Sequence, residues 1–269
     1  MSKTKRTQLK INGTLISYLF HKGGENSIAF IHGFGSYKEV FIEGFESEEL
    51  RSFTLLSADL IGFGDSGKPR SFSYHLREQA SVLKKVIEYL GIERFHIIAH
   101  SMGGIIGIEL AEMMPGRIRA LINLEGNLSI EDCTMSKQVA QMSEGYFAQK
   151  GFESLRNSIA EESKKAGNES LRDYLKSLAK GTPESLHRSA MSTVHESSRG
   201  DLLTRFKKLP LYKCYIYGEK NKGVFPAEKM LKQKGILLFY VSNSGHSMMK
   251  ENPKEFYDLV LKIIRSLED

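Results

Sequence analysis

The stretch that constrains the fold most is residues 95–114, FHIIAHSMGGIIGIELAEMM. It opens with a short apolar run, and from Gly104 onward apolar residues recur at the i, i+3, i+4 spacing of a helix. This pattern predicts a buried strand that turns directly into a helix. Small residues stand two positions before and two positions after Ser101, at Ala99 and Gly103.

The segment around Ser101 is one small residue away from G-x-S-x-G, the nucleophile elbow, in which a serine lies on a strained strand-to-helix turn. Larger side chains two positions away would clash with the helix and the neighbouring strand, so Gly or Ala is required there. Ser101 would lie at a helix N-terminus, whose unpaired N–H groups favour nearby negative charge. The motif indicates a nucleophile, and the alternative is a serine that only caps a buried helix.

Strands and helices alternate on both sides of this segment. Residues 7–20 alternate around Asn12-Gly13, which predicts an antiparallel hairpin of two edge strands. The glycine-rich residues 59–67 predict an irregular loop. Further strands are predicted at 27–31, 53–58, 119–124, 211–217 and 236–241, and helices at 38–50, 74–90, 226–234 and 253–267. Such alternation implies right-handed crossovers and a mainly parallel sheet covered by helices on both faces.

The alternation stops between residues 126 and 208, where helix-like segments rich in Ser, Lys and Glu contain no convincing strand. An insertion of this size cannot be a structureless loop, so we expect a helical cap over the sheet. The predicted domains are therefore a core of residues 1–125 and 209–269 and a cap of residues 126–208. Three methionines of the cap are predicted to fill its core, with a place in an apolar substrate cavity as the alternative: Met135, Met142 and Met191.

Composition limits the classes of protein that the chain can represent. Its 269 residues are 41% hydrophobic, which is typical of a globular protein. The net charge of +6 comes from basic residues spread along the chain, and the one tight basic cluster is short, Lys3, Lys5 and Arg6. We therefore expect a solvated surface and no nucleic-acid partner. The positive charge slightly favours anionic substrates. Cys133 and Cys214 lack metal-type spacing and are predicted to be buried thiols.

The charged N-terminus is not followed by the apolar core of a signal peptide, and no apolar run is long enough to cross a bilayer. We therefore expect a cytoplasmic protein without a membrane partner. The sequence leaves the oligomeric state open.

Five short strings carry a resemblance to a known family: HGFG at 32–35, DLIGFGDSG at 59–67, AHSMGG at 99–104, YGEKN at 217–221 and SGH at 244–246. Because the five strings occur in the order and spacing of the family, the chain resembles the lid-bearing serine hydrolases of the α/β-hydrolase superfamily. The resemblance spans nearly the whole length. It implies an α/β fold with a mainly parallel eight-stranded sheet, an inserted helical cap, and catalysis that needs no metal and no cofactor.

The resemblance assigns roles to four residues. Ser101 is the nucleophile, and His246, in a polar loop after the last strand, is the base that takes its proton. The backbone N–H groups of Phe34 and Met102 form the oxyanion hole. Two other histidines near the motifs are predicted to make structural hydrogen bonds in the pocket wall: His32 and His100.

The acid departs from the common family pattern. Most members carry an aspartate where this chain has Asn221, and an amide cannot balance an imidazolium charge. Glu125 ends the strand predicted at 119–124 and resembles the acid of haloalkane dehalogenases and their relatives, which follows that strand. Glu219 is the other candidate. We predict that Glu125 is the acid and that Asn221 lends it a hydrogen bond.

A serine at the elbow indicates acyl transfer followed by hydrolysis, since dehalogenases and epoxide hydrolases of the superfamily use an aspartate there. The leading hypothesis is hydrolysis of an ester, lactone or thioester of a small to medium acyl substrate. One alternative is a carbon–carbon bond hydrolase of a dioxo acid, which arginines in the pocket would favour. The other is an inactive hydrolase fold that binds a ligand.

Overall fold

The computed structural model of the chain describes residues 4–267, so Lys3 of the basic cluster lies outside the described residues. Within that range the chain forms one eight-stranded sheet of order β1-β2-β4-β3-β5-β6-β7-β8. Pairing is antiparallel from β1 to β2 and from β2 to β4 and parallel elsewhere, which confirms the predicted mainly parallel sheet. The strands are β1 (Lys5–Ile11), β2 (Thr14–His21), β3 (Ser27–Ile31), β4 (Thr54–Ala58), β5 (Phe95–His100), β6 (Ile118–Leu124), β7 (Tyr212–Gly218) and β8 (Leu237–Val241).

The hairpin predicted at Asn12-Gly13 is present, and both residues have positive φ, 48° and 83°, as a tight primed turn requires. Only one of its strands lies at the edge of the sheet. The prediction of two edge strands was wrong because β2 pairs with β4 on its second side, where Tyr18 lies opposite Ala58. This pairing satisfies the backbone groups of β2 in the sheet interior.

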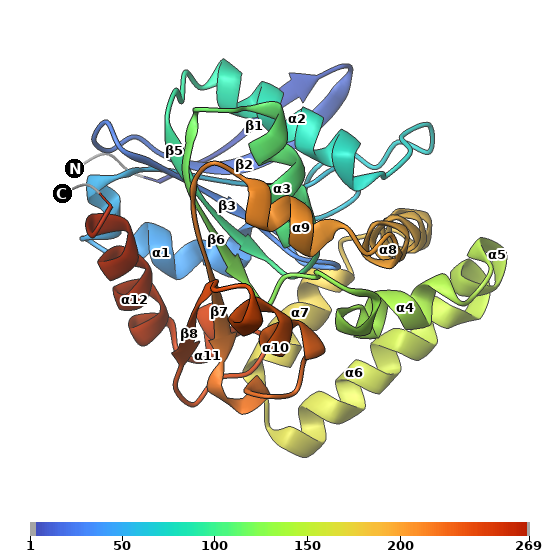
Figure 1. The fold of residues 1–269 in the computed structure, drawn as a ribbon. Helices are drawn as coiled ribbons and strands as arrows, with labels where there is room; N and C mark the ends of the chain where they lie inside the picture. The colour runs from blue at the N-terminus through green and yellow to red at the C-terminus, as the bar shows by residue number, and fades with distance from the viewer. Residues whose placement is uncertain (1–3, 268–269) are drawn as a thin grey trace.

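Helices cover both faces of the sheet, as Figure 1 shows, with α1 and α12 on one side and α2 and α3 on the other. Each pair packs on its own cluster of buried side chains. Among the described residues, none of the helices combines the length and the apolar character of a membrane span. Outside the insertion the helices are α1 (Ile42–Glu46), α2 (Leu76–Tyr89), α3 (Met102–Met113), α10 (Pro226–Gln233), α11 (Met248–Glu251) and α12 (Pro253–Arg265).

The helix predicted over residues 38–50 is present but shorter. The segment contains only α1, preceded by the 3-10 turn Lys38–Phe41 and followed by the 3-10 turn Leu50–Ser52. At its start, the backbone N–H and the ammonium of Lys38 both donate to the buried carboxylate of Asp59, at 2.7 and 2.8 Å. This long-range contact fixes the start of the segment against the loop that follows β4.

The region between β6 and β7 contains only helices among its described residues, as predicted. Figure 1 shows α4, α5, α6 and α8 gathered on the right of the sheet. The division into a core and a cap stays a prediction, and we call residues 126–208 the inserted region. Its helices are α4 (Thr134–Ala140), α5 (Glu144–Tyr146), α6 (Phe152–Ala166), α7 (Glu169–Leu178), α8 (Pro183–Ser198) and α9 (Leu202–Lys208).

The side chains of the inserted region only partly follow the prediction of core filling. Met142 packs against the core, and Met135 packs against it while also lining a cavity. Met191 is 47% exposed because its position on α8 faces solvent. Cys133 and Cys214 are free and buried, as predicted.

Close packing explains the small residues on both sides of Ser101. Ala99 is fully buried, and a Cβ added at Gly103 would lie 2.7 Å from the carbonyl oxygens of both Ile31 and His32. These oxygens belong to the backbone and cannot move without disturbing β3. Only a glycine lets α3 approach the end of β3 this closely.

We expect Gly103→Ala to lower the free energy of unfolding by about 2 kcal/mol, because the added methyl overpacks a rigid contact. Gly145→Ala is the matched control: it lies in α5 with no heavy atom within 4 Å of an added Cβ. It should leave stability unchanged or raise it by about 0.5 kcal/mol. Urea unfolding of both variants measures the difference, and equal effects would contradict the steric explanation.

Candidate active site

Ser101 occupies a strained backbone position between β5 and α3. Its φ is 53° and its ψ is −123°, a conformation that costs about 1–3 kcal/mol for a residue other than glycine. The surrounding structure holds it there, since its N–H donates to the carbonyl of Leu124 at 2.9 Å and its own carbonyl accepts from Gly104 at 2.8 Å. The turn predicted from the motif is therefore present.

Glu125 is strained in the same way, with φ of 43°, directly after β6 and beside the end of β5. Its side chain is 1% exposed, so its charge requires partners inside the protein. Oε1 accepts from the N–H of Gly218 at 2.8 Å. The side-chain amide of Asn221 donates to both carboxylate oxygens, at 3.1 and 2.8 Å.

His246 lies in the loop after β8, and its Nδ1 is 2.8 Å from Oε2 of Glu125. Because a carboxylate only accepts hydrogen bonds, Nδ1 carries the proton and Nε2 is left with a lone pair. Nε2 of His100 donates to the backbone carbonyl of His246 at 2.9 Å, which holds this residue from the opposite side. The base and the acid predicted from the sequence are thus hydrogen-bonded to each other.

Glu219, the second candidate acid, does not contact His246 in the described structure. Its Oε2 accepts from the backbone N–H of Asn243 at 3.3 Å, on the exposed side of the loop. The carboxylate that reaches the imidazole is that of Glu125, and Asn221 contributes the hydrogen bonds predicted for it.

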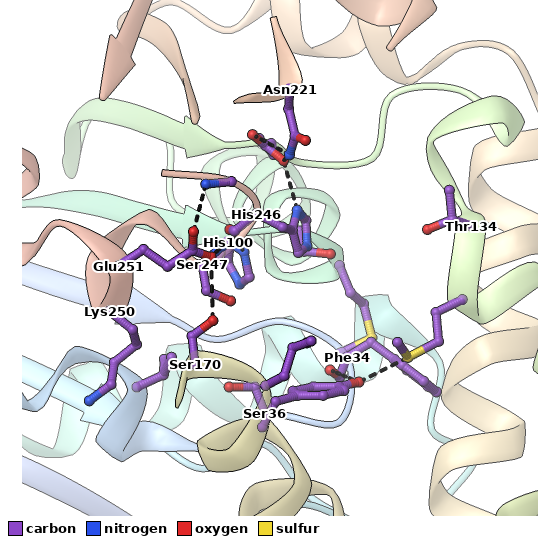
Figure 2. A pocket seen from close by; sticks show the side chains of 18 of the residues that line it. Phe34, Ser36, His100, Thr134, Ser170, Asn221, His246, Ser247, Lys250 and Glu251 are labelled. Atoms are coloured by element: carbon purple, nitrogen blue, oxygen red, sulfur yellow. Dashed lines mark hydrogen bonds and ion pairs between the residues drawn. The ribbon is translucent and has the colours of Figure 1, made fainter. Parts of the chain in front are cut away.

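A cavity of about 510 Å³ brings the predicted residues together. Figure 2 shows Phe34, His100, Asn221 and His246 around it, and the lining includes all five residues predicted for the nucleophile, base, acid and oxyanion hole: Ser101, His246, Glu125, Phe34 and Met102. Within residues 4–267 no hydrogen bond joins the hydroxyl of Ser101 to His246. Such contacts often tighten only when substrate is bound.

The turn at residues 32–35 packs directly on the elbow. A Cβ added at Gly33 would lie 3.0 Å from the Cβ of Ser101. Gly35 has φ of +65°, and a Cβ there would lie 2.6 Å from the hydroxyl of Tyr174. The two glycines therefore let the backbone around Phe34 approach Ser101 on one side and the inserted region on the other.

His32 orients the peptide group that contains the N–H of Phe34. Its Nε2 accepts from the N–H of Leu60 at 3.0 Å, so its Nδ1 carries the proton and donates to the carbonyl of Gly33 at 2.9 Å. Burial lowers the pKa of His32, which keeps the ring neutral. Burial, with His246 nearby, lowers the pKa of His100 as well. Both histidines make hydrogen bonds to the backbone, as predicted, but only His100 lines the cavity.

The sequence reading missed the contributions of α7. The hydroxyl of Tyr174 donates to the carbonyl of Phe34 at 3.1 Å, and burial raises its pKa so that it stays protonated. Ser177 donates to the carbonyl of Gly35 at 2.9 Å. No motif marks these residues, and only the amphipathic pattern of α7 could have indicated that one of its faces meets the core.

The charged side chains that line the cavity are mostly acidic. Two lysines are present, Lys220 and Lys250, and no arginine is found among the described residues of the lining. Lys250 lies within ion-pair distance of Glu43, outside the lining, and of Asp173. The carboxylates of the lining are Glu39, Glu125, Asp132, Glu162, Asp173 and Glu251.

One group of carboxylates has the spacing of a metal site, Glu39, Asp59 and Asp65. The ammonium of Lys38 lies 3.1, 2.8 and 2.8 Å from these three side chains. Although burial opposes its charge, the carboxylates raise the pKa of Lys38, and hydrogen bonds from Lys180 and Lys38 lower the pKa of Asp65 to about 2. The lysine thus supplies the cation that this group needs.

Comparison with known proteins places these observations in a family context. The sequence model of the α/β hydrolase fold family matches residues 26–202. The probable lysophospholipase BODYGUARD 2 of Arabidopsis thaliana is 35% identical over 106 residues, which are 38% of this chain and 22% of that protein. This chain therefore spans about a fifth of the length of that relative.

Solved structures resemble the whole chain at low sequence identity. The N-acyl homoserine lactonase AidH, in complex with N-hexanoyl homoserine, is 21% identical with a TM-score of 0.78, and 98% of each chain is covered. A thermophilic esterase from Thermogutta terrifontis, with malate bound, is 18% identical with a TM-score of 0.79 and covers 98% of this chain and 100% of its own. At these identities the likeness establishes the fold alone.

We expect Asn221→Asp to destabilise the protein although it restores the common aspartate. It removes the amide donor and places a second carboxylate within about 3 Å of Glu125, which should cost about 2 kcal/mol at pH 8. The pair raises a folded-state carboxyl pKa above its unfolded value, so the penalty should shrink as the pH falls to 5.

Urea unfolding at pH 5 and pH 8 measures this change. Asn221→Ala is the control, because it removes the donor without adding a charge, and its penalty should depend less on pH. A variant Asn221→Asp as stable as wild type at pH 8 would contradict the contact with Glu125.

Proposed function

The chain belongs to the α/β-hydrolase fold family, and we propose that it is a serine hydrolase of carboxylic esters, lactones or thioesters. The observation that carries the proposal is the hydrogen bond between His246 and the buried Glu125, next to a strained serine that lines the same cavity. Strained backbone conformations and buried charged groups are destabilising, and they cluster at functional sites of proteins.

In the proposed reaction, the hydroxyl oxygen of Ser101 attacks the carbonyl carbon of the substrate while Nε2 of His246 takes the hydroxyl proton. The imidazolium that forms is stabilised by the carboxylate of Glu125 across the 2.8 Å contact. The N–H groups of Phe34 and Met102 donate to the oxyanion. The protonated His246 then gives its proton to the leaving group, and an acyl-serine ester remains.

Water completes the cycle by the same route. His246 takes a proton from a water molecule, whose oxygen attacks the acyl-serine carbonyl. Collapse of the second tetrahedral intermediate returns the proton to Ser101 and releases the carboxylic acid. His32 supports both steps, since its hydrogen bond to the Gly33 carbonyl holds the N–H of Phe34 in one direction.

The inserted region is proposed to act as a cap that holds the acyl group. Tyr174 and Met135 come from this region, and both line the cavity beside Phe34. The aromatic ring and the thioether offer apolar contact next to the reacting carbonyl, which suits a small to medium acyl chain.

The lining favours neutral substrates over anionic ones. Its six carboxylates outnumber its two lysines, although Glu39 and Asp173 have cationic partners outside the lining, in Lys38 and Lys176. A dioxo acid would meet this negative field without an arginine to bind it, so the carbon–carbon hydrolase alternative has no support from the lining. An inactive hydrolase fold would be expected if the amide at Asn221 left His246 without an acid, and the contact from Glu125 to His246 supports the active alternative instead.

We expect a fluorophosphonate probe to label wild type at Ser101 and to leave Ser101→Ala unlabelled, because only an activated hydroxyl reacts at a useful rate.

Glu125→Gln should lower kcat for p-nitrophenyl butyrate by about 10³- to 10⁴-fold while the protein stays folded. Glu219→Gln should change kcat much less. The reverse order of the two glutamine variants would show that the acid is assigned wrongly.

Substrate charge gives a separate prediction. We expect kcat/KM for p-nitrophenyl butyrate to exceed that for mono-p-nitrophenyl succinate by about tenfold or more at low salt, because the anion meets an acidic lining. Added salt and the substitution Asp173→Asn should both narrow the ratio. A preference for the anionic ester would contradict the proposed substrate class.

A further inference from the structure

The loop that carries His246 is held by a second carboxylate, which the reaction above does not use. Glu251 ends the short helix α11, and its side chain turns back toward the loop, as Figure 2 shows. Oε2 accepts from the N–H of Gly245 at 2.8 Å, and Oε1 accepts from the N–H of Ser247 at 3.3 Å. These residues flank His246 on both sides, so one side chain restrains the backbone on either side of the imidazole.

The same loop packs tightly on the strand end that supports Glu125. A Cβ added at Gly218 would lie 2.1 Å from the carbonyl oxygen of Gly245, and the N–H of Gly218 donates to Glu125. The backbone N–H of Lys220 donates to the carbonyl of Ser244 at 3.0 Å. A shift of the loop would therefore change the distance between the imidazole and its acid.

Glu251 also contacts the inserted region. The hydroxyl of Ser170, in the first turn of α7, lies 3.3 Å from Oε1 of Glu251 and 2.8 Å from Oδ1 of Asn168, and these two oxygens share it as a donor. The ammonium of Lys220 is 3.9 Å from Oε2, and the Glu251 side chain is only 15% exposed. Limited exposure strengthens these contacts, because little water competes for the carboxylate.

We propose that Glu251 is a positioning residue for His246 and that Ser170 couples the inserted region to it. This inference rests on the proposed function, since it assigns a role to the loop of the base. A carboxylate is required because its two oxygens accept from three donors, the N–H groups of Gly245 and Ser247 and the hydroxyl of Ser170. A glutamine has one acceptor oxygen, and its NH2 group would face an N–H donor.

The test uses the full chain and the rate at which a fluorophosphonate probe labels Ser101. Glu251→Gln should lower this rate by about 10- to 100-fold, the usual loss when a reacting group is misplaced by about 1 Å. With p-nitrophenyl butyrate, kcat should fall by a similar factor while KM stays unchanged, because Glu251 positions the base and does not bind the substrate.

Glu255→Gln is the matched control. Glu255, on α12, accepts from the N–H of Ser242 at 3.0 Å, so it holds the same loop at a point that does not flank His246. Its replacement should lower the melting temperature about as much as Glu251→Gln does but leave the labelling rate within about twofold of wild type. A purely structural role for Glu251 would instead give the two variants equal labelling rates.

A double-mutant cycle tests the coupling to α7. Ser170→Ala alone should slow labelling about two- to fivefold, and it should have no further effect once Glu251 is glutamine. If the two substitutions slow labelling by independent factors, the coupling is overturned. If wild type is labelled and Glu251→Gln is labelled at the same rate, the positioning role is overturned while the proposed function stands. A wild type that no probe labels would overturn the proposed function itself, and the inference with it.

Discussion

The burial of the Glu125 carboxylate is the constraint on which the rest of the site depends. A charge that is 1% exposed must be compensated by donors inside the protein, and an uncompensated one would cost several kcal/mol. The donors come from separate parts of the chain: the end of β7 at Gly218, the following turn at Asn221, and the loop after β8 at His246. Because Glu125 itself follows β6, the hydrogen bonds of this one carboxylate bring the ends of β6, β7 and β8 together.

Backbone strain complements this electrostatic requirement. Ser101 and Glu125 both have positive φ, and they follow the adjacent strands β5 and β6. A parallel sheet with helices on both faces is rigid enough to hold such conformations, provided that small residues such as Gly103 allow the close approach of α3. The backbone thus directs the proposed nucleophile and the proposed acid before any side-chain rotation is considered.

The helix α7 provides a connection of the inserted region to this site. Three of its hydroxyl groups donate to the core: Tyr174 and Ser177 to the carbonyls of Phe34 and Gly35, and Ser170 to Glu251. These contacts reach both the turn proposed as the oxyanion hole and the loop of the proposed base. A shift of α7 would therefore change contacts at both.

The sequence by itself determined the alternation of strands and helices and the turns at Asn12-Gly13 and Ser101, because periodicity and small residues are local signals. Glu125 as the candidate acid came from the resemblance to a known family. Tertiary structure alone decided that β2 lies inside the sheet, that Lys38 binds the buried carboxylate of Asp59, and that the cavity lining is mainly acidic. These outcomes depend on groups far apart in the chain that meet only after folding. The contact between Glu125 and His246 spans 121 residues, so the family resemblance indicated both residues but only the folded chain brings them together.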